Sequence, residues 1–308
     1  MQPQRQDIMV IGTLEDLFTA CFVVIDDLYR QFAPKEVVQR PGPPPSLSDA
    51  EVITVALVGE LFGMEVEGRW YSLVQQHYRG LFPGLNERSR FNRRRRNLWQ
   101  VSNWLRQRLM ETLVDPNDPW RILDSFPLVV ANWGRRSRVR VAREEGGFGK
   151  SHAKEFRFFG YRVHLLISLE GVVTNFVLAP ANPHDSTVAP EVFEGMEGLI
   201  GLGDKAYASL PLETELAQHQ IQLLALRRKD SRRPLPEALA KLVRSTRQLV
   251  ETVGSQLSQV FHMEHNLAKS TWGIKTRLID KLLAHTMGCY LNHLLGRPLL
   301  HMAGLVYH

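Results

Sequence analysis

In the first third of the chain, apolar residues recur at three- and four-residue steps, the spacing that predicts amphipathic helices. A first helix is expected from Thr13 to Phe32, and the proline-rich segment 41–45 then breaks the pattern. Ser48 and Glu51 fit a capping box, in which each side chain accepts the other residue's backbone N–H, so a second helix should start there. A longer helix is expected from Ser89 to Leu113.

From Trp120 onward the period changes, and short apolar runs alternate with helical segments. We expect strands at 121–126, 161–169, 172–179, 199–203 and 222–226, and helices at 185–196, 212–219 and 235–260. This order predicts an α/β fold with a mixed sheet flanked by helices. Two domains follow: a small all-helical domain at 1–115, and an α/β domain with C-terminal helices at 116–308.

The composition is that of an ordinary globular protein, but its positive charge is concentrated. The net charge is +6, and eight arginines and no acid lie between Arg88 and Arg108. Segments 135–162 and 227–247 hold nine and eight basic residues against three and two acids. Clustered positive charge indicates a polyanionic partner, nucleic acid first of all. A membrane is the weaker alternative, because no apolar run approaches the roughly 18–20 residues that a span requires.

Nothing at the start of the sequence is typical of a signal peptide. The two cysteines, Cys21 and Cys289, provide neither a disulfide framework nor a zinc site, and we expect both thiols to be buried. These features favour a cytoplasmic protein.

The arginine-rich helix suits a helix-turn-helix-like module that binds DNA. We expect DNA contacts from Arg93, Arg94, Arg95 and Arg96, because no acid neutralises them; the alternative is a solvated face. Segment 133–159, with Arg135 and Arg136, is expected to form a flexible basic flap over DNA. Its glycines do not have the spacing of a phosphate-binding loop.

Three acids occupy unusual places. Asp124 interrupts an apolar strand, Asp204 ends another, and Glu251 lies on the polar side of the long helix. Such carboxylates suit Mg²⁺, and two ions about 3.5–4 Å apart can support in-line cleavage of a phosphodiester. The pattern alone is weak, because an Asp at a strand end is more often a turn or capping residue.

Short sequence motifs around these acids are more specific than the three acids alone. They are Ile122-Leu-Asp-Ser-Phe-Pro127, Tyr161-Arg-Val-His-Leu-Leu166, Asn182-Pro-His-Asp-Ser186, Gly203-Asp-Lys-Ala-Tyr207, Arg247-x3-Glu251-Thr and the earlier Ser89-Arg-Phe-Asn-Arg93. Over about residues 45–265 the chain resembles the DDE transposases of bacterial insertion sequences, most of all insertion-sequence family 982. The resemblance implies an RNase H-like sheet on which Asp124, Asp204 and Glu251 are the catalytic metal ligands.

The sequence around the third ligand departs from the motif of related transposases, Tyr-x2-Arg-x3-Glu-x6-Lys. Arg247 and Glu251 match it, but Arg244 stands at the tyrosine position and Ser258 at the lysine position. Glu264 and Asp230 are therefore alternatives for the third ligand.

Further residues are candidates for supporting roles. His184 and Asp185 could support the metal site or touch the scissile phosphate, although Asp185 could equally cap the next helix. Lys205 and Tyr207 could contact DNA phosphate or a flipped base. Arg247 could hold DNA or pair with Glu251. His164 is expected on the surface of its strand.

The resemblance implies a DNA transposase that hydrolyses the ends of an insertion sequence and then transfers the strand. It further implies two Mg²⁺ ions per site, replaceable by Mn²⁺, and double-stranded DNA as partner (terminal inverted repeats and target). A homodimer is expected in the active complex, and no membrane is expected as a partner. Two alternatives stay open: a structure-specific nuclease of the same fold, and a catalytically silent, domesticated DNA-binding protein.

Overall fold

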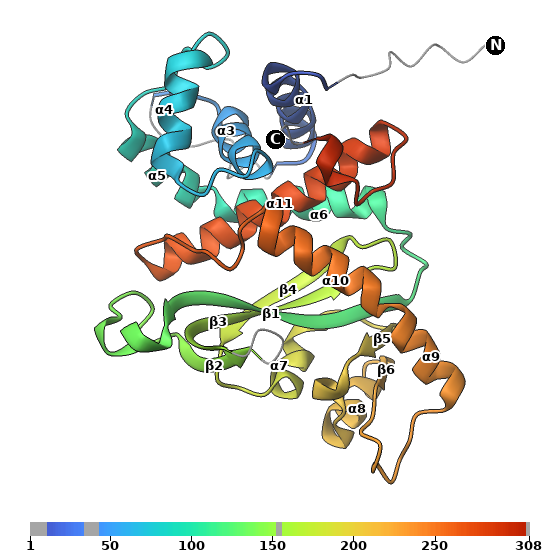
Figure 1. Cartoon of the computed structure of the whole chain (residues 1–308). Coiled ribbons are helices and arrows are strands. Elements are labelled where there is room, and N and C mark those ends of the chain that lie inside the picture. Colours follow the sequence, from blue (N-terminus) through green and yellow to red (C-terminus); the bar gives the residue numbers. More distant parts are fainter. Residues whose placement is uncertain (1–10, 34–42, 152–155, 306–308) are drawn as a thin grey trace, which may run out of the picture. The chain divides into compact units, whose positions relative to one another are not determined.

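The computed structural model describes residues 11–33, 43–151 and 156–305, which form two units (Figure 1). The first unit takes the residues up to 109 together with those from 278 onward, and the second takes residues 110–277. The C-terminal segment thus belongs with the N-terminal helices, whereas the sequence analysis expects one domain over 116–308.

The first unit is helical. Its elements are α1 (Leu14–Phe32), α3 (Asp49–Leu61), α4 (Glu67–His77), α5 (Arg88–Asn97), most of α6 (Trp99–Leu113), most of α11 (Thr271–Leu294) and the short η4 (Met302–Gly304). The predicted capping box of α3 is confirmed, since Ser48 and Glu51 accept each other's backbone N–H. The ring of Phe18 on α1 packs against Trp70 and Phe82, with centroids 5.7 and 5.1 Å away.

The predicted helix from Ser89 to Leu113 is two helices. The backbone leaves the helical region at Leu98 (φ −91°, ψ 5°), which ends α5 while its side chain is fully buried. On α5 the side chains divide by helical period: Phe91 and Arg95 are buried, whereas Arg90, Arg93 and Asn97 are exposed.

The expectation that no acid neutralises the arginines of α5 is wrong. Arg95 is 6% exposed and donates to Asp280 at 2.6 Å, Glu67 at 2.9 Å and Glu60 at 3.1 Å. Arg94 is likewise paired with Asp49, at 2.6 Å. A charge taken out of water must be paired in this way, so Arg95 holds the helices of the first unit together and does not face solvent.

The buried network reaches the C-terminal helix at two points. Asp280 pairs with Arg95, and the adjacent Lys281 pairs with Glu60 of α3 at 2.6 Å. These contacts join α11 to α3 and α5 within the first unit.

The second unit contains a mixed six-stranded sheet of order β2-β3-β1-β5-β6, with β4 also paired to β3. Its strands are β1 (Trp120–Asn132), β2 (Gly147–Ser151), β3 (Phe156–Ile167), β4 (Val173–Pro180), β5 (Ile200–Gly203) and β6 (Gln222–Ala225). β1 to β4 pair antiparallel, whereas β1, β5 and β6 pair parallel. The predicted α/β class and mixed sheet are confirmed; β2 lies in the segment for which a flexible flap was expected.

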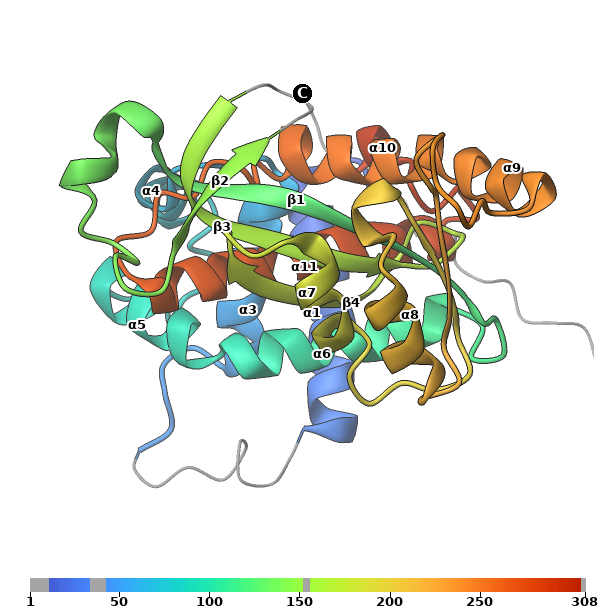
Figure 2. The ribbon, with the colours of Figure 1, turned by 90° about the horizontal axis from the view of Figure 1, so that it is seen from below.

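Helices cover both sides of this sheet (Figure 1). They are α7 (Asp185–Val192) against β3 and β4, α8 (Leu210–Ala217) and α9 (Glu237–Ser245) against β6, and α10 (Arg247–Ser255) against β1. In Figure 2, viewed from below, α7 lies in front of the sheet. The helix predicted at 235–260 is interrupted at Thr246 and ends in a π-helical turn, Gln256–Val260. Two short 3-10 segments, η1 (Trp133–Arg138) and η2 (Lys205–Tyr207), follow β1 and β5.

Among the described residues, no helix is long and apolar enough to cross a lipid bilayer. Both cysteines are buried, as expected.

Candidate active site

Asp124 lies on β1, and Asp204 directly follows the neighbouring strand β5. β1 and β5 run parallel, and Leu123 is the Cα partner of Gly203. Each aspartate directly follows one of these partners. Asp204 comes where β5 ends, and its carboxylate accepts the backbone N–H of Ala206 at 2.8 Å, which starts η2. Parallel pairing thus brings together two carboxylates that are far apart in sequence.

The environment of both carboxylates favours their protonated forms. Burial raises the pKa of Asp124 to about 7, and the negative charges of Asp204 and Asp185 add to that rise. Asp204 is exposed to solvent, yet partial burial of its carboxylate raises its pKa as well, and the negative charge of Asp185 raises it further. The positive charge of Arg247 lowers the pKa of Asp204. Like charges held this close favour a cation between them.

Asp185 is the third carboxylate of this cluster. It is the first residue of α7, and its Oδ2 accepts the hydroxyl of Ser125 at 3.1 Å. The helix is capped by His184, whose Nδ1 accepts the N–H of Ser186. The alternative in which Asp185 caps the helix is therefore wrong, and the Asp185 carboxylate faces the strand that carries Asp124.

Arg162 holds Asp185 in this position. Its Nη1 lies 3.2 Å from Ser125 Oγ and 3.5 Å from Asp185 Oδ1, and its Nη2 donates to the carbonyl of Lys150 at 2.7 Å. One guanidinium thereby joins β1, β2, β3 and α7. Ser125 and Arg162 were not predicted as site residues. Strand alternation could have indicated them: Arg162 and His164 point to the same side of β3, and His164 is the Cα partner of Ser125.

Glu251 lies on α10, close to the part of this helix that packs on β1. A side chain at Gly254 would collide with the ring of Phe126, so this part of α10 packs directly on β1. Phe126 and Asp124 point to the same side of the strand, because they are two residues apart. Glu251 lies three positions before Gly254 and Arg247 seven, which places both near the same face of the helix.

In the structure the Glu251 carboxylate pairs with Arg247 at 2.8 Å, and the two side chains are 64% and 79% exposed. Among the described residues, no three Asp, Glu, His or Cys side chains lie together closely enough to hold a metal. The role of Glu251 as third ligand therefore stays a prediction. Of the alternatives, Glu264 accepts from Ser258 at 3.1 Å, and Asp230 lies exposed in a loop.

Two residues near the carboxylates are more deeply buried than expected. His164 is fully buried and not on the sheet surface, and its burial lowers its pKa to about 4. Tyr207 is 1% exposed within the apolar cluster that contains Leu123 and Leu212, so its position argues against the predicted DNA contact.

The other predicted DNA contacts are distributed over the surface. Arg93, Arg135 and Lys205 are exposed, and Arg96 is partly exposed. The side chain of Arg136 lies outside the part of the chain that the structure describes.

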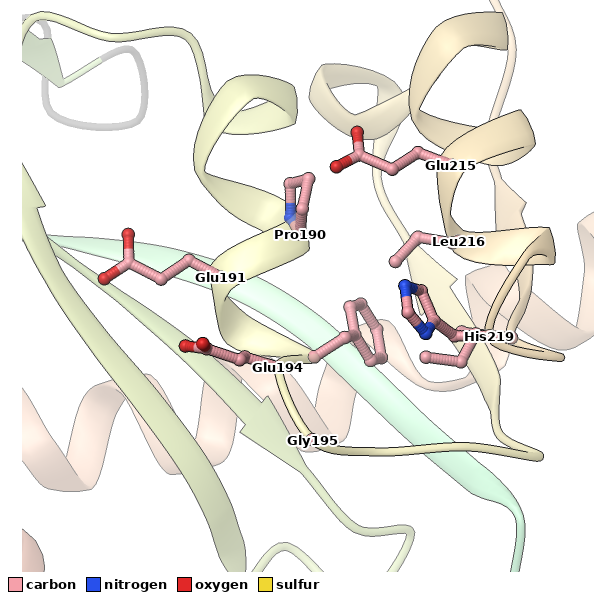
Figure 3. Close-up of a pocket in the computed structure, with 9 residues that line it drawn as sticks. Pro190, Glu191, Glu194, Gly195, Glu215, Leu216 and His219 are labelled. Carbon is pink, nitrogen blue, oxygen red and sulfur yellow. The ribbon is translucent and has the colours of Figure 1, made fainter.

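A pocket of about 350 Å³ lies elsewhere in the second unit, between α7 and α8 (Figure 3). Its lining includes the apolar side chains of Phe193 and Leu216 and the carboxylates of Glu191, Glu194 and Glu215. It contains none of the predicted site residues, and its negative charge would repel a phosphate.

Comparison with known proteins adds independent findings. The family model described as "Transposase DDE domain" matches residues 117–271, a stretch that contains Asp124, Asp204 and Glu251. The chain is also similar to "Transposase for insertion sequence element IS1106" of Neisseria meningitidis serogroup B, with 32% identity over 155 residues. That match covers 46% of this chain and 54% of the relative, so it spans about half the length of each protein. No solved structure matches. Neither finding names insertion-sequence family 982, which stays a prediction.

Proposed function

The chain belongs to the family of transposase DDE domains, and on this basis we propose that it is an insertion-sequence transposase. It would cleave the ends of its element and join the released 3′-hydroxyl to target DNA. The observation that carries the proposal is that Asp124 and Asp204 each directly follow one member of the Cα pair Leu123–Gly203 on adjacent parallel strands, inside the matched family region.

We assign Asp124 and Asp204 as the ligands of a divalent cation. The carboxylates fit such an ion, because the negative charges of Asp204 and Asp185 raise the pKa of Asp124, and a cation would relieve that repulsion. Oxygen donors suit Mg²⁺, with Mn²⁺ as a substitute, and two ions per site follow from the chemistry of the family. The metal would stabilise the charge that develops on the reacting phosphate.

Glu251 would complete the ligand set. Its place on α10, three residues before Gly254, supports this role, because Gly254 packs on Phe126, which points to the same side of β1 as Asp124. A rotation of its side chain away from Arg247 would then leave that cation near Asp204, where its positive charge could hold a DNA phosphate. His184 and Asp185 would support the site, with Asp185 held by Ser125 and Arg162.

The exposed cations would bind the DNA backbone. On α5 this role falls to the exposed Arg93 and Arg90, since Arg94 and Arg95 are engaged with acids. In the second unit it falls to Arg135, Lys205 and Arg247. The substrate would be duplex DNA with terminal inverted repeats, and a homodimer would pair the two ends.

The test is cleavage of a labelled duplex that carries the end of the element, with Mg²⁺. Asp124→Asn, Asp204→Asn and Glu251→Gln should each abolish cutting while DNA binding is retained, and Glu170→Gln, an exposed carboxylate in the β3–β4 turn, is the matched control. Cutting without strand transfer would indicate a structure-specific nuclease. Tight binding without any cutting by the unmodified protein would indicate a silent DNA-binding protein.

A further inference from the structure

An exposed aromatic pair lies at the end of the sheet where β1 leads into η1. Phe148 of β2 is 51% exposed and Trp133 is 37% exposed, which is unusual for large apolar side chains. Their rings meet edge to face with centroids 5.5 Å apart, and Phe148 also packs on the largely buried Phe159, at 5.2 Å. Both exposed rings are therefore held in place by ring contacts.

The glycines of β2 fix the side of the sheet on which Phe148 lies. A side chain at Gly147 would collide with Asn182, and one at Gly149 would come within 2.8 Å of Ala181 and of the Phe158 ring. β2 can lie against the segment before α7 only because these two positions lack side chains. Strand alternation then directs Phe148 to the opposite side.

Basic residues adjoin the aromatic pair on β2, β3 and η1. The guanidinium of Arg157 lies 5.6 Å from the centre of the Trp133 ring. Lys150 is the Cα partner of Arg157 across β2 and β3, and both side chains are exposed. Arg135, two residues after Trp133, is exposed as well. Flat π-faces next to fixed positive charges are the combination that binds single-stranded nucleic acid, through stacked bases and neutralised phosphates.

We propose that Trp133 and Phe148, with Arg157 and Lys150, form a stacking site for an unpaired base of the DNA substrate. This inference rests on the proposed function, since it takes DNA as the ligand. The adjoining cations favour a nucleic acid over an apolar protein surface, because burying unpaired positive charges against apolar groups would be costly.

The site lies on the same side of the sheet as Asp124. Leu165 is the Cα partner of Asp124, and Phe159 and Arg157 alternate with the same period along β3. Six residues separate Leu165 from Phe159, so the stacking site lies about 20 Å along β3 from the carboxylate. This corresponds to about six nucleotides of a DNA strand. The base that stacks here therefore belongs to a flank of the scissile position.

The experiment compares two labelled DNAs by fluorescence anisotropy: a blunt duplex, and the same duplex with an unpaired 3′ extension of about six thymidines. The variants are Phe148→Leu, which removes the ring, and Phe148→Tyr, which retains it. The matched control is Leu169→Ala, which truncates an exposed apolar side chain in the turn between β3 and β4. Light scattering reports the oligomeric state of each protein.

The unmodified protein should bind the extended duplex more tightly than the blunt one. Phe148→Leu should lose on the order of tenfold in affinity for the extended duplex only, the effect of one stacked base, whereas Phe148→Tyr and Leu169→Ala should behave as the unmodified protein. Equal binding of the extended duplex by Phe148→Leu and the unmodified protein overturns the proposal. So does an equal loss on both DNAs, or a loss of self-association, which would make this surface a contact between copies.

The outcomes also separate this inference from the proposed function. If the unmodified protein binds and cuts DNA but does not prefer the extension, only the stacking site is refuted. If it binds neither DNA, the proposed function is refuted and the stacking site with it.

Discussion

Asp124 and Asp204 directly follow Leu123 and Gly203, which are Cα partners on two parallel strands. The sheet therefore brings the two aspartates close together, and the backbone N–H of Ala206 orients the carboxylate of Asp204. This arrangement stabilises a bound cation but destabilises the metal-free protein, because like charges are held together.

Asp124→Asn should stabilise the metal-free protein at alkaline pH. The pKa of Asp124 in the folded state is about 7, above the ordinary value near 3.8, so the folded state holds this proton more tightly than the unfolded state. The stability that the proton provides is complete below about pH 4 and is lost as the pH rises through 7. Asparagine does not titrate, so in EDTA at pH 8 the free energy of unfolding of the variant should exceed that of the unmodified protein by about 1 kcal/mol or more. The variant should therefore have the higher melting temperature.

At pH 4 most of the difference between the two melting temperatures should be gone, because Asp124 is then protonated in the folded state and about half protonated in the unfolded state. Glu170→Gln should show no such pH-dependent difference. A lower melting temperature for Asp124→Asn at pH 8 would contradict the raised pKa.

Mg²⁺ should raise the melting temperature of the unmodified protein, because an ion that binds only the folded state stabilises it by mass action. Calorimetry should show this increase abolished in Asp204→Asn and reduced in Glu251→Gln. Glu264→Gln is the comparison for the third ligand. If Glu264→Gln loses the Mg²⁺ effect and Glu251→Gln keeps it, the third ligand is Glu264.

Arg95→Met should unfold the first unit. The substitution leaves Glu60, Glu67 and Asp280 without their shared cation, and breaking a buried ion pair from one side costs about 3–5 kcal/mol. Circular dichroism during urea unfolding would record the loss. A variant as stable as the unmodified protein would show that Arg95 is dispensable for the fold.

Arg93→Gln should leave folding intact and weaken DNA binding. Arg93 is on the exposed side of α5, where substitutions usually change stability by less than about 0.5 kcal/mol. Loss of one phosphate contact should reduce the slope of log affinity against log salt by about 1. An unchanged slope would place the DNA on another surface.

Gly147→Ala should displace β2. The added methyl group would meet the backbone N of Asn182 at 2.8 Å as well as its side-chain oxygen, and such overpacking costs about 1–3 kcal/mol. Hydrogen exchange should show faster exchange at the amides of β2. Gly134→Ala is the control, because nothing lies within 4 Å of the methyl group it would add. Protection of β2 in Gly147→Ala equal to that in Gly134→Ala would show that the strand tolerates the methyl group.

The strands that carry the two aspartates could be predicted from the sequence. Short apolar runs such as those before Asp124 and Asp204, bounded by turn residues, are local patterns, and the sheet that joins them follows from the alternation of strands and helices. The strand β2 could not be predicted this way, because Gly147 and Gly149 are typical of loops. The structure shows why glycine is required at these positions: a side chain would collide with Asn182 or Ala181.

The neutralisation of the arginines on α5 could not be predicted from the sequence pattern either. Arg95 is neutralised by Glu60 and Asp280, which are 35 and 185 residues away, so no window around α5 contains its partners. For Glu251, helical period places the residue on a face of α10, but the ion pair with Arg247 depends on the side-chain conformation.

The network around Arg95 also determines the order in which the units can fold during synthesis. When a ribosome has released the chain as far as residue 277, the whole of the second unit has left, but Asp280 and Lys281 have not. Until they emerge, Arg95 lacks the carboxylate of Asp280 and Glu60 lacks the ammonium group of Lys281. The ion pairs to α11 therefore form last, whereas the sheet with Asp124 and Asp204 can already form. A polypeptide cut short before Asp280 would accordingly retain Asp124 and Asp204 and lack the ion pairs that α11 makes within the helical unit.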